Sequence, residues 1–171
     1  MDKFTNNSID IGLLPQFEEV GFQPISKNYL IKVNLQNFLL LCITMIGWGV
    51  FTYFEISNTL SIILFILIVL FFVFQFWNTF KQQKNYGFAL REKDILFRRG
   101  YLVNKTTVVP FNRIQHASIF SDVLDKYLKI ATLKIFTAGG SGSDIIIPGL
   151  TPDLALRLKE ALATKLTEHE L

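Results

Sequence analysis

The 171-residue sequence is short of the side chains on which enzyme and metal sites depend. It has one cysteine, Cys42, so no internal disulfide can form, and a single thiol without a histidine cluster is neither a metal site nor a nucleophile candidate. Of its two histidines, only His116 lies outside the acidic tail that holds His169. The sequence contains no nucleophile elbow, metal-ligand set or phosphate loop, so we expect no enzyme activity and no cofactor.

Charge is missing from one long stretch. Residues 33–80 contain no lysine or arginine, and one acid, Glu55. Residues 60–77 hold fifteen Leu, Ile, Val or Phe in eighteen positions, enough to cross a hydrocarbon core of about 30 Å at about 1.5 Å per residue. Residues 35–54, with ten such residues in twenty, form a weaker span. We therefore predict a transmembrane helical hairpin at residues 35–78, with spans at 35–54 and 60–77.

The basic residues that flank the hairpin predict its orientation. Lys27 and Lys32 precede the first span, Lys81 and Lys84 follow the second, and the turn between the spans has no base. By the positive-inside rule, both termini lie in the cytoplasm of a multi-pass protein of the cell (plasma or inner) membrane. The alternative is a soluble hairpin buried in a core, but a chain of this length cannot enclose two helices that are apolar on every face and still fold the rest.

Downstream of the hairpin the pattern changes to short alternating stretches typical of strands. Residues 81–85 are predicted to be a short basic polar link, and residues 121–130 a loop with a helical turn whose Val123, Leu124, Tyr127 and Leu128 point inward. A C-terminal helix follows, with Thr151 as its N-cap and Pro152 at its first position. The predicted strands are 86–91, 95–103, 106–111, 114–120, 131–138 and 144–148.

Six short motifs occur in order within this part of the chain. They are Val109-Pro110, Arg113-Ile114-Gln115-His116, Leu124-Asp125, Ala131-Thr132-Leu133, Thr137-Ala138-Gly139-Gly140 and Pro148-Gly149-Leu150. In this order and spacing, residues 87–166 resemble the bacterial pleckstrin-homology-like (PH-like), membrane-flanked domain family of YdbS-like membrane proteins. The resemblance implies a multi-pass membrane protein with a cytoplasmic PH-like barrel.

The expected fold is accordingly that of an α+β membrane protein. An N-terminal cytoplasmic segment, residues 1–34, precedes the transmembrane hairpin. A bacterial PH-like domain at residues 81–168 follows it, as an antiparallel β-barrel or sandwich capped by a C-terminal α-helix.

Two groups of residues are candidates for binding. We predict that the first contacts a protein partner, and the resemblance suggests another PH-like-domain membrane protein or a second copy of this chain. This group is Arg113, Gln115, Thr137, Gly139 and Gly140. The second group is basic and is predicted to contact anionic lipid: Lys81, Lys84, Arg98 and Arg99. The alternative for these bases is that they only follow the positive-inside rule.

Regular alternation places Arg113 and Gln115 on one strand face and His116 on the other, so they cannot converge on one ligand. We interpret His116 as a structural residue hydrogen-bonded to a neighbouring loop. Bases and acids alternate along residues 81–171, so no nucleic-acid partner is expected. The favoured function is a membrane-anchored, non-enzymatic interaction module that binds a protein partner, and the alternative is a module that senses anionic lipid at the inner membrane face.

Overall fold

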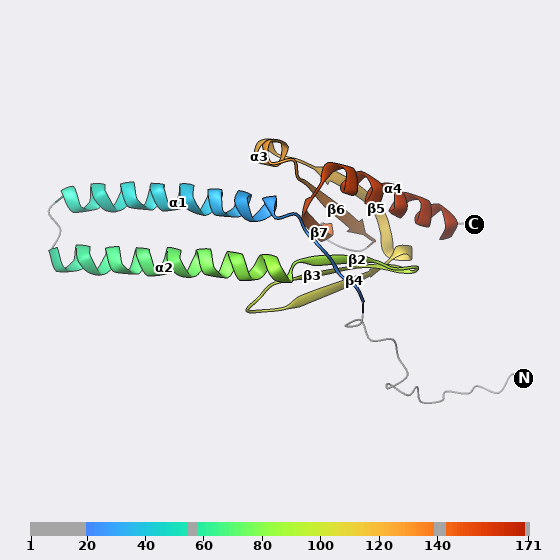
Figure 1. Cartoon of the computed structure of the whole chain (residues 1–171), viewed down its shortest axis with the longest axis horizontal. Helices are drawn as coiled ribbons and strands as arrows, with labels where there is room; N and C mark the ends of the chain where they lie inside the picture. Colours follow the sequence, from blue (N-terminus) through green and yellow to red (C-terminus); the bar gives the residue numbers. More distant parts are fainter. Residues whose placement is uncertain (1–19, 55–57, 139–142, 170–171) are drawn as a thin grey trace, which may run out of the picture.

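Two long helices project side by side from one end of a β-rich domain (Figure 1). They are α1 (Asn28–Tyr53) and α2 (Asn58–Asn85). The structure is a computed structural model that describes residues 20–54, 58–138 and 143–169. The predicted turn residue Glu55 lies outside the described residues.

Both helices have the length and apolarity of membrane spans. In the most apolar 18-residue stretch of each helix, only 6% of α1 and 11% of α2 is buried. The core helices of a soluble protein are mostly buried instead. Ile43, Ile46 and Val73, for example, remain more than three-fifths exposed. Polar contacts join the seam: Asn37 Nδ2 donates to Thr79 Oγ1 at 3.2 Å, and Trp48 Nε1 donates to the Ser61 carbonyl at 3.1 Å. Together these features indicate a membrane protein.

The helices extend beyond the apolar stretches towards the domain. The predicted link at residues 81–85 is wrong, because these residues continue α2 to Asn85. Lysine and glutamine are good helix formers, so the loss of apolarity after Phe80 does not end the helix. Lys81 and Lys84 therefore stand on a rigid helical turn.

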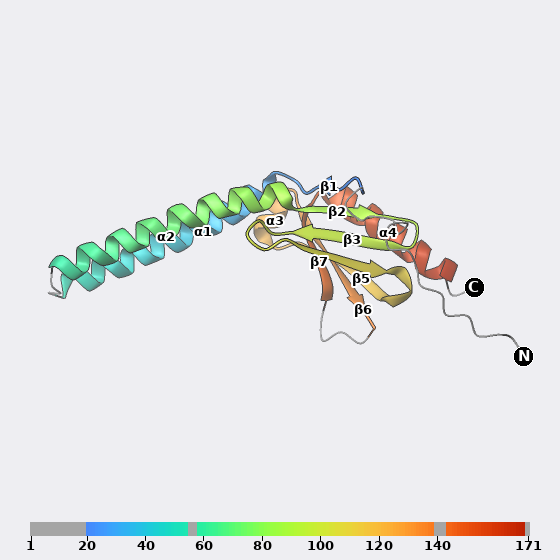
Figure 2. The ribbon, with the colours of Figure 1, turned by 90° about the horizontal axis from the view of Figure 1, so that it is seen from below.

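The described strands form two antiparallel sheets. In Figure 2 the strands β2 and β3 run along the hairpin axis, whereas β6 and β7 run obliquely to it. The first sheet has the order β1 (Gln23–Pro24), β2 (Gly87–Leu90), β3 (Asp94–Arg99) and β4 (Lys105–Pro110). The second has the order β5 (Ile114–Phe120), β6 (Ala131–Thr137) and β7 (Ser143–Leu150).

Three helical segments complete the domain: η3 (Phe111–Arg113), α3 (Val123–Tyr127) and α4 (Pro152–His169). The predicted start of α4 is confirmed, with Thr151 Oγ1 accepting from the Leu154 amide at 3.4 Å. The helix packs across β5, β6 and η3, and it buries Ala155, Leu158 and Leu162. The core between the sheets and α4 includes Phe88, Ile95, Phe97, Phe111, Leu133, Ile135 and Ile147.

The first strand lies before the hairpin in the sequence, yet it belongs to the domain that follows. Gln23 pairs with Phe88 and Pro24 with Gly87. The next residue but one, Ser26, donates its amide to the Gly149 carbonyl of β7 at 2.7 Å. The domain thus contains residues from before and after the hairpin in the sequence. Both helices are therefore joined to the domain, α1 through β1 and α2 through β2.

Candidate functional site

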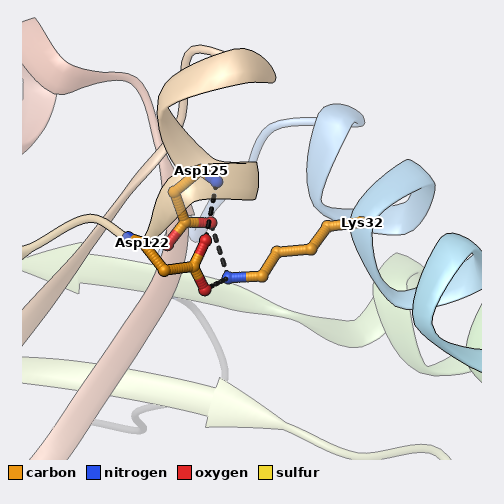
Figure 3. A network of polar contacts seen from close by, with 3 residues as sticks. All are labelled: Lys32, Asp122 and Asp125. Carbon is orange, nitrogen blue, oxygen red and sulfur yellow. Dashed lines mark hydrogen bonds and ion pairs between the residues drawn. The ribbon is translucent and has the colours of Figure 1, made fainter.

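The junction between the hairpin and the domain contains an ion-pair cluster built around one buried carboxylate (Figure 3). Lys32 Nζ on α1 lies 2.6 Å from Asp125 Oδ1 on α3 and 2.7 Å from Asp122 Oδ2 just before α3. The Asp125 side chain is 2% exposed, so its charge needs a partner. Lys32 provides one, although the sequence alone suggested only that it marked the cytoplasmic side.

Local sequence explains why the two carboxylates converge. Asp122 Oδ1 accepts from the Asp125 amide at 2.8 Å, and Asp125 Oδ2 accepts from the Asp122 amide at 3.2 Å, a reciprocal capping box at the start of α3. The hydrogen bond from Lys32, followed by that from the Asp125 amide, lowers the pKa of Asp122 below its ordinary value. The lowered pKa favours the ionised form of Asp122, and the contacts of Lys32 with both aspartates tie α3 to α1.

The burial of Asp125 sets the rotation of α3. Its carboxylate faces the junction, so the positions on the opposite side of this short helix face outward. Val123 and Tyr127 are each 84% exposed, so the prediction that these two point inward is wrong, whereas Leu124 and Leu128 are half-buried. The apolar pattern of residues 121–130 could not reveal this, because the buried group is a charged one whose partner is 93 residues away.

A cavity of about 300 Å³ opens beside the cluster, between the hairpin and the two sheets. Tyr29, Lys32 and Gln36 of α1 line one side, and Arg99 and Thr132 are among the strand residues that line the rest. Because Lys32 is already paired with two carboxylates, Arg99 supplies most of the free positive charge of this cavity.

The predicted lipid-contacting residues differ in the aromatic rings that they contact. Lys81 Nζ lies 5.9 Å from the Trp77 ring centroid and 5.8 Å from that of Tyr101, and the two rings meet edge to face at 5.6 Å. Lys84, on the next turn of α2, lies 4.7 Å from the Phe80 ring centroid. Arg98 has a different contact: its guanidinium lies 4.3 Å from the ring centroid of Phe22, just before β1.

The buried Nε atom of Arg98 has no hydrogen-bond partner within the described residues. All four residues lie at the hairpin end of the domain, because Arg98 pairs with Gly87 just after α2. Arg98 differs in its packing: it is half-buried and contacts Phe22 near β1, whereas Lys84 and Arg99 are exposed.

Three of the predicted partner-contacting residues lie close together: Arg113 at the end of η3, Gln115 in β5 and Thr137 at the end of β6. Ile114 pairs with Thr137, and the Arg113 carbonyl accepts from the Ala138 amide at 2.9 Å, so Arg113 and Gln115 lie beside the end of β6. Arg113 and Gln115 are both exposed. Gly139 and Gly140 lie outside the described residues. Figure 1 places the start of β5 and the end of β6 at the end of the domain away from the hairpin.

His116 is not the structural residue that the sequence predicted. A bulge between Ile114 and His116 breaks the regular alternation, so Ile114 is buried while both Gln115 and His116 are exposed. The His116 ring stacks on Phe136 at 4.3 Å with an interplanar angle of 14°. No hydrogen bond from its side chain to a loop is found in the part of the chain that the structure describes. Arg113, Gln115 and His116 are therefore all exposed on a stretch that regular alternation would have divided between two faces.

Among the described residues, no group of three or more His, Cys, Asp or Glu could hold a metal ion. The two sheets, the helix across them and the apolar hairpin instead define a membrane protein with a PH-like binding domain. A family model described as "Bacterial PH domain" matches residues 23–166, and the chain belongs to this family. No curated protein and no solved structure matches the chain significantly.

The family match begins at β1, so the strand before the hairpin is part of the family pattern. This agrees with the pairing of β1 and β2 across the hairpin. The match does not distinguish YdbS-like proteins from other members, and that narrower resemblance stays a prediction.

Proposed function

We propose that this chain is a membrane-anchored, non-enzymatic interaction module whose PH-like domain binds a protein partner on the cytoplasmic side. The hairpin crosses the cell membrane twice, with both termini in the cytoplasm. The observation that supports this function most is the joining of Arg113, Gln115 and the end of β6 in one exposed surface, at the end of the domain away from the hairpin. A partner in the cytoplasm can reach this surface without displacing lipid.

The chemistry of this surface suits protein recognition. An exposed arginine fork and an amide can pair with carboxylates and backbone groups, and the stacked rings of His116 and Phe136 add a flat apolar area. Among the described strands, nearby β4 pairs with β3 on one side and with none on the other, and so offers an edge for an added strand. We propose another PH-like-domain membrane protein, or a second copy, as the partner.

The experiment is affinity purification of the intact tagged chain from its native membrane in mild detergent, with quantitative mass spectrometry. We expect a stoichiometric partner that is lost with Arg113→Ala plus Gln115→Ala. The matched control is Arg157→Ala, an exposed arginine on α4 whose loss should leave capture unchanged. Recovery of the chain without a protein partner or a second copy, or equal loss in the control, would contradict the proposal.

A second candidate function is sensing of anionic lipid. The gathering of Lys81, Lys84 and Arg99 at the hairpin end favours it, because headgroups of the inner leaflet lie at this level if the hairpin spans the bilayer. The turn at residues 91–94 is self-neutralised by the Arg91–Asp94 ion pair, so specific recognition of several phosphates there is not proposed.

A further inference from the structure

We propose that the domain docks onto the bilayer through two apolar projections, the β3–β4 turn (residues 100–104) and α3. The partner is the lipid surface that the hairpin itself crosses. This inference rests on the spanning hairpin but not on the protein partner proposed for the opposite end of the domain.

The exposed side chains of the two projections are unusual for a domain surface. Leu102 and Val103 in the turn are 64% and 80% exposed, and Val123 and Tyr127 in α3 are each 84% exposed. Within the described part of the domain, these four are the most exposed large apolar side chains. Exposed apolar groups gathered at one end of a molecule mark an interaction surface.

The depth of the β3–β4 turn follows from its contact with α2. From Asn58 to Trp77, α2 is about 30 Å long at about 1.5 Å per residue, which matches the hydrocarbon core and places Trp77 at its inner boundary. Tyr101 in the turn contacts the Trp77 ring. Tryptophan and tyrosine rings favour this boundary, so the neighbouring Leu102 and Val103 lie within reach of the acyl chains.

On the other side of the hairpin, the ion pairs of Lys32 hold α3 beside the first turns of α1. Figures 1 and 2 both show α3 and the β3–β4 turn at the hairpin end of the domain, and Figure 1 shows them on opposite sides of the hairpin. The rotation imposed by buried Asp125 directs Val123 and Tyr127 outward. Both projections are therefore fixed by contacts with the helices.

The charges around the projections complement an anionic leaflet. Lys32 offsets part of the acidic charge of Asp122 and Asp125. Basic side chains flank both apolar tips, with aliphatic stems that suit the headgroup region. They are Lys81, Lys84, Arg99, Lys105, Lys126 and Lys129.

The position of the hairpin favours lipid over a protein as the occupant. A single protein partner would have to pass around the two helices to cover both projections. A bilayer surrounds the hairpin on every side and meets both projections at once. The docked surface is thus continuous with the surface that the helices already present to lipid.

The test uses the intact chain with Cys42→Ala and one nitroxide-labelled cysteine, Leu102→Cys or Val123→Cys. Each variant is reconstituted in phosphatidylethanolamine and phosphatidylglycerol vesicles, so dilute that most vesicles hold a single chain. Spin relaxation by oxygen, which enriches in lipid, is compared with relaxation by a water-soluble nickel complex. The control label is Glu92→Cys, in the β2–β3 turn at the far end of the domain.

We expect oxygen to be the stronger relaxant at both 102 and 123, and nickel at 92. Labels at 102 or 123 that are as accessible to nickel as the label at 92 would overturn the proposal. Shielding that develops only at high protein density would also overturn it, because the occupant would then be a second copy. A variant enters the comparison only when its circular dichroism and elution volume match those of the parent.

Discussion

Lys32 and Asp125 are 93 residues apart in the sequence, and their charged atoms lie 2.6 Å apart at the base of the hairpin. The pair joins the first helix to α3, and both side chains are mostly withdrawn from water. Removing one member of such a pair leaves the other charge buried without compensation. The orientation of the hairpin relative to the domain therefore depends on this contact.

Replacing Lys32 with alanine is expected to destabilise the protein by about 3 kcal/mol, because Asp125 loses its cation. For a chain of this size the loss corresponds to a decrease of roughly 6 to 12 °C in the unfolding midpoint. Thermal unfolding in detergent measures the midpoint, and the control is Lys27→Ala, an exposed lysine five residues earlier at the N-cap of α1. Equal midpoints for the two variants would show that the pair contributes no stability.

The same cluster predicts a dependence of stability on pH. The folded-state pKa of Asp122 is lower than its ordinary value of 3.8, so its contribution to stability is full above that value and is lost as the pH falls through the folded pKa. Asp122→Asn keeps an N-cap acceptor but not the charge. Between pH 5 and pH 3 the thermal unfolding midpoint of the parent should fall more steeply than that of Asp122→Asn. The same pH dependence of the midpoint in both proteins would refute this prediction.

Replacing Gly149 with alanine is expected to destabilise the protein. Its φ is +68°, and an added Cβ would lie 2.6 Å from Tyr29 Cβ, where α1 crosses β7. The left-handed conformation alone costs a non-glycine residue about 1 to 2 kcal/mol, and the collision adds to it. We predict that Gly149→Ala lowers the unfolding midpoint by about 4 °C or more. Gly21→Ala, which meets no atom within 4 Å, should leave it unchanged, and similar midpoints would contradict this packing.

The four basic residues predicted to contact lipid should not behave alike. Arg99→Ala and Lys84→Ala are expected to weaken the preference of the reconstituted chain for phosphatidylglycerol, because both side chains are exposed at the hairpin end of the domain. Arg98→Ala should leave lipid preference unchanged and lower stability, since Arg98 packs on Phe22. Lipid enrichment around the purified chain, measured by mass spectrometry, checks this. An equal effect of all three variants would place Arg98 at the membrane as well.

Much of the fold could be predicted because it depends on local patterns. The bounds of β5 are those expected from alternation, and Thr151 followed by Pro152 marks the start of α4. The apolar run from residue 60 to 77 likewise lies within α2. In each case the signal is contained in a few neighbouring residues, so it survives without knowledge of the tertiary structure.

The rest depends on contacts between distant residues. β1 has two residues, too few for any periodicity, and it exists because β2 pairs with it across the hairpin. A bulge at the start of β5 reverses the side of His116, and a salt bridge sets the rotation of α3. The sequence therefore did not show that Arg113, Gln115 and His116 are exposed together, and it did not predict the Lys32 cluster at all. Partner binding by these residues stays a prediction.

The proposed function requires that the hairpin crosses the membrane with the domain on the cytoplasmic side. Single cysteines at Asn58→Cys, Gly21→Cys and Lys159→Cys, in the Cys42→Ala background, test it by reaction with a membrane-impermeant maleimide. In intact cells with a permeable outer layer, the account predicts labelling at 58 alone, with 21 and 159 labelled only after lysis. Labelling of 159 in intact cells, or protection of 58 until lysis, would contradict it.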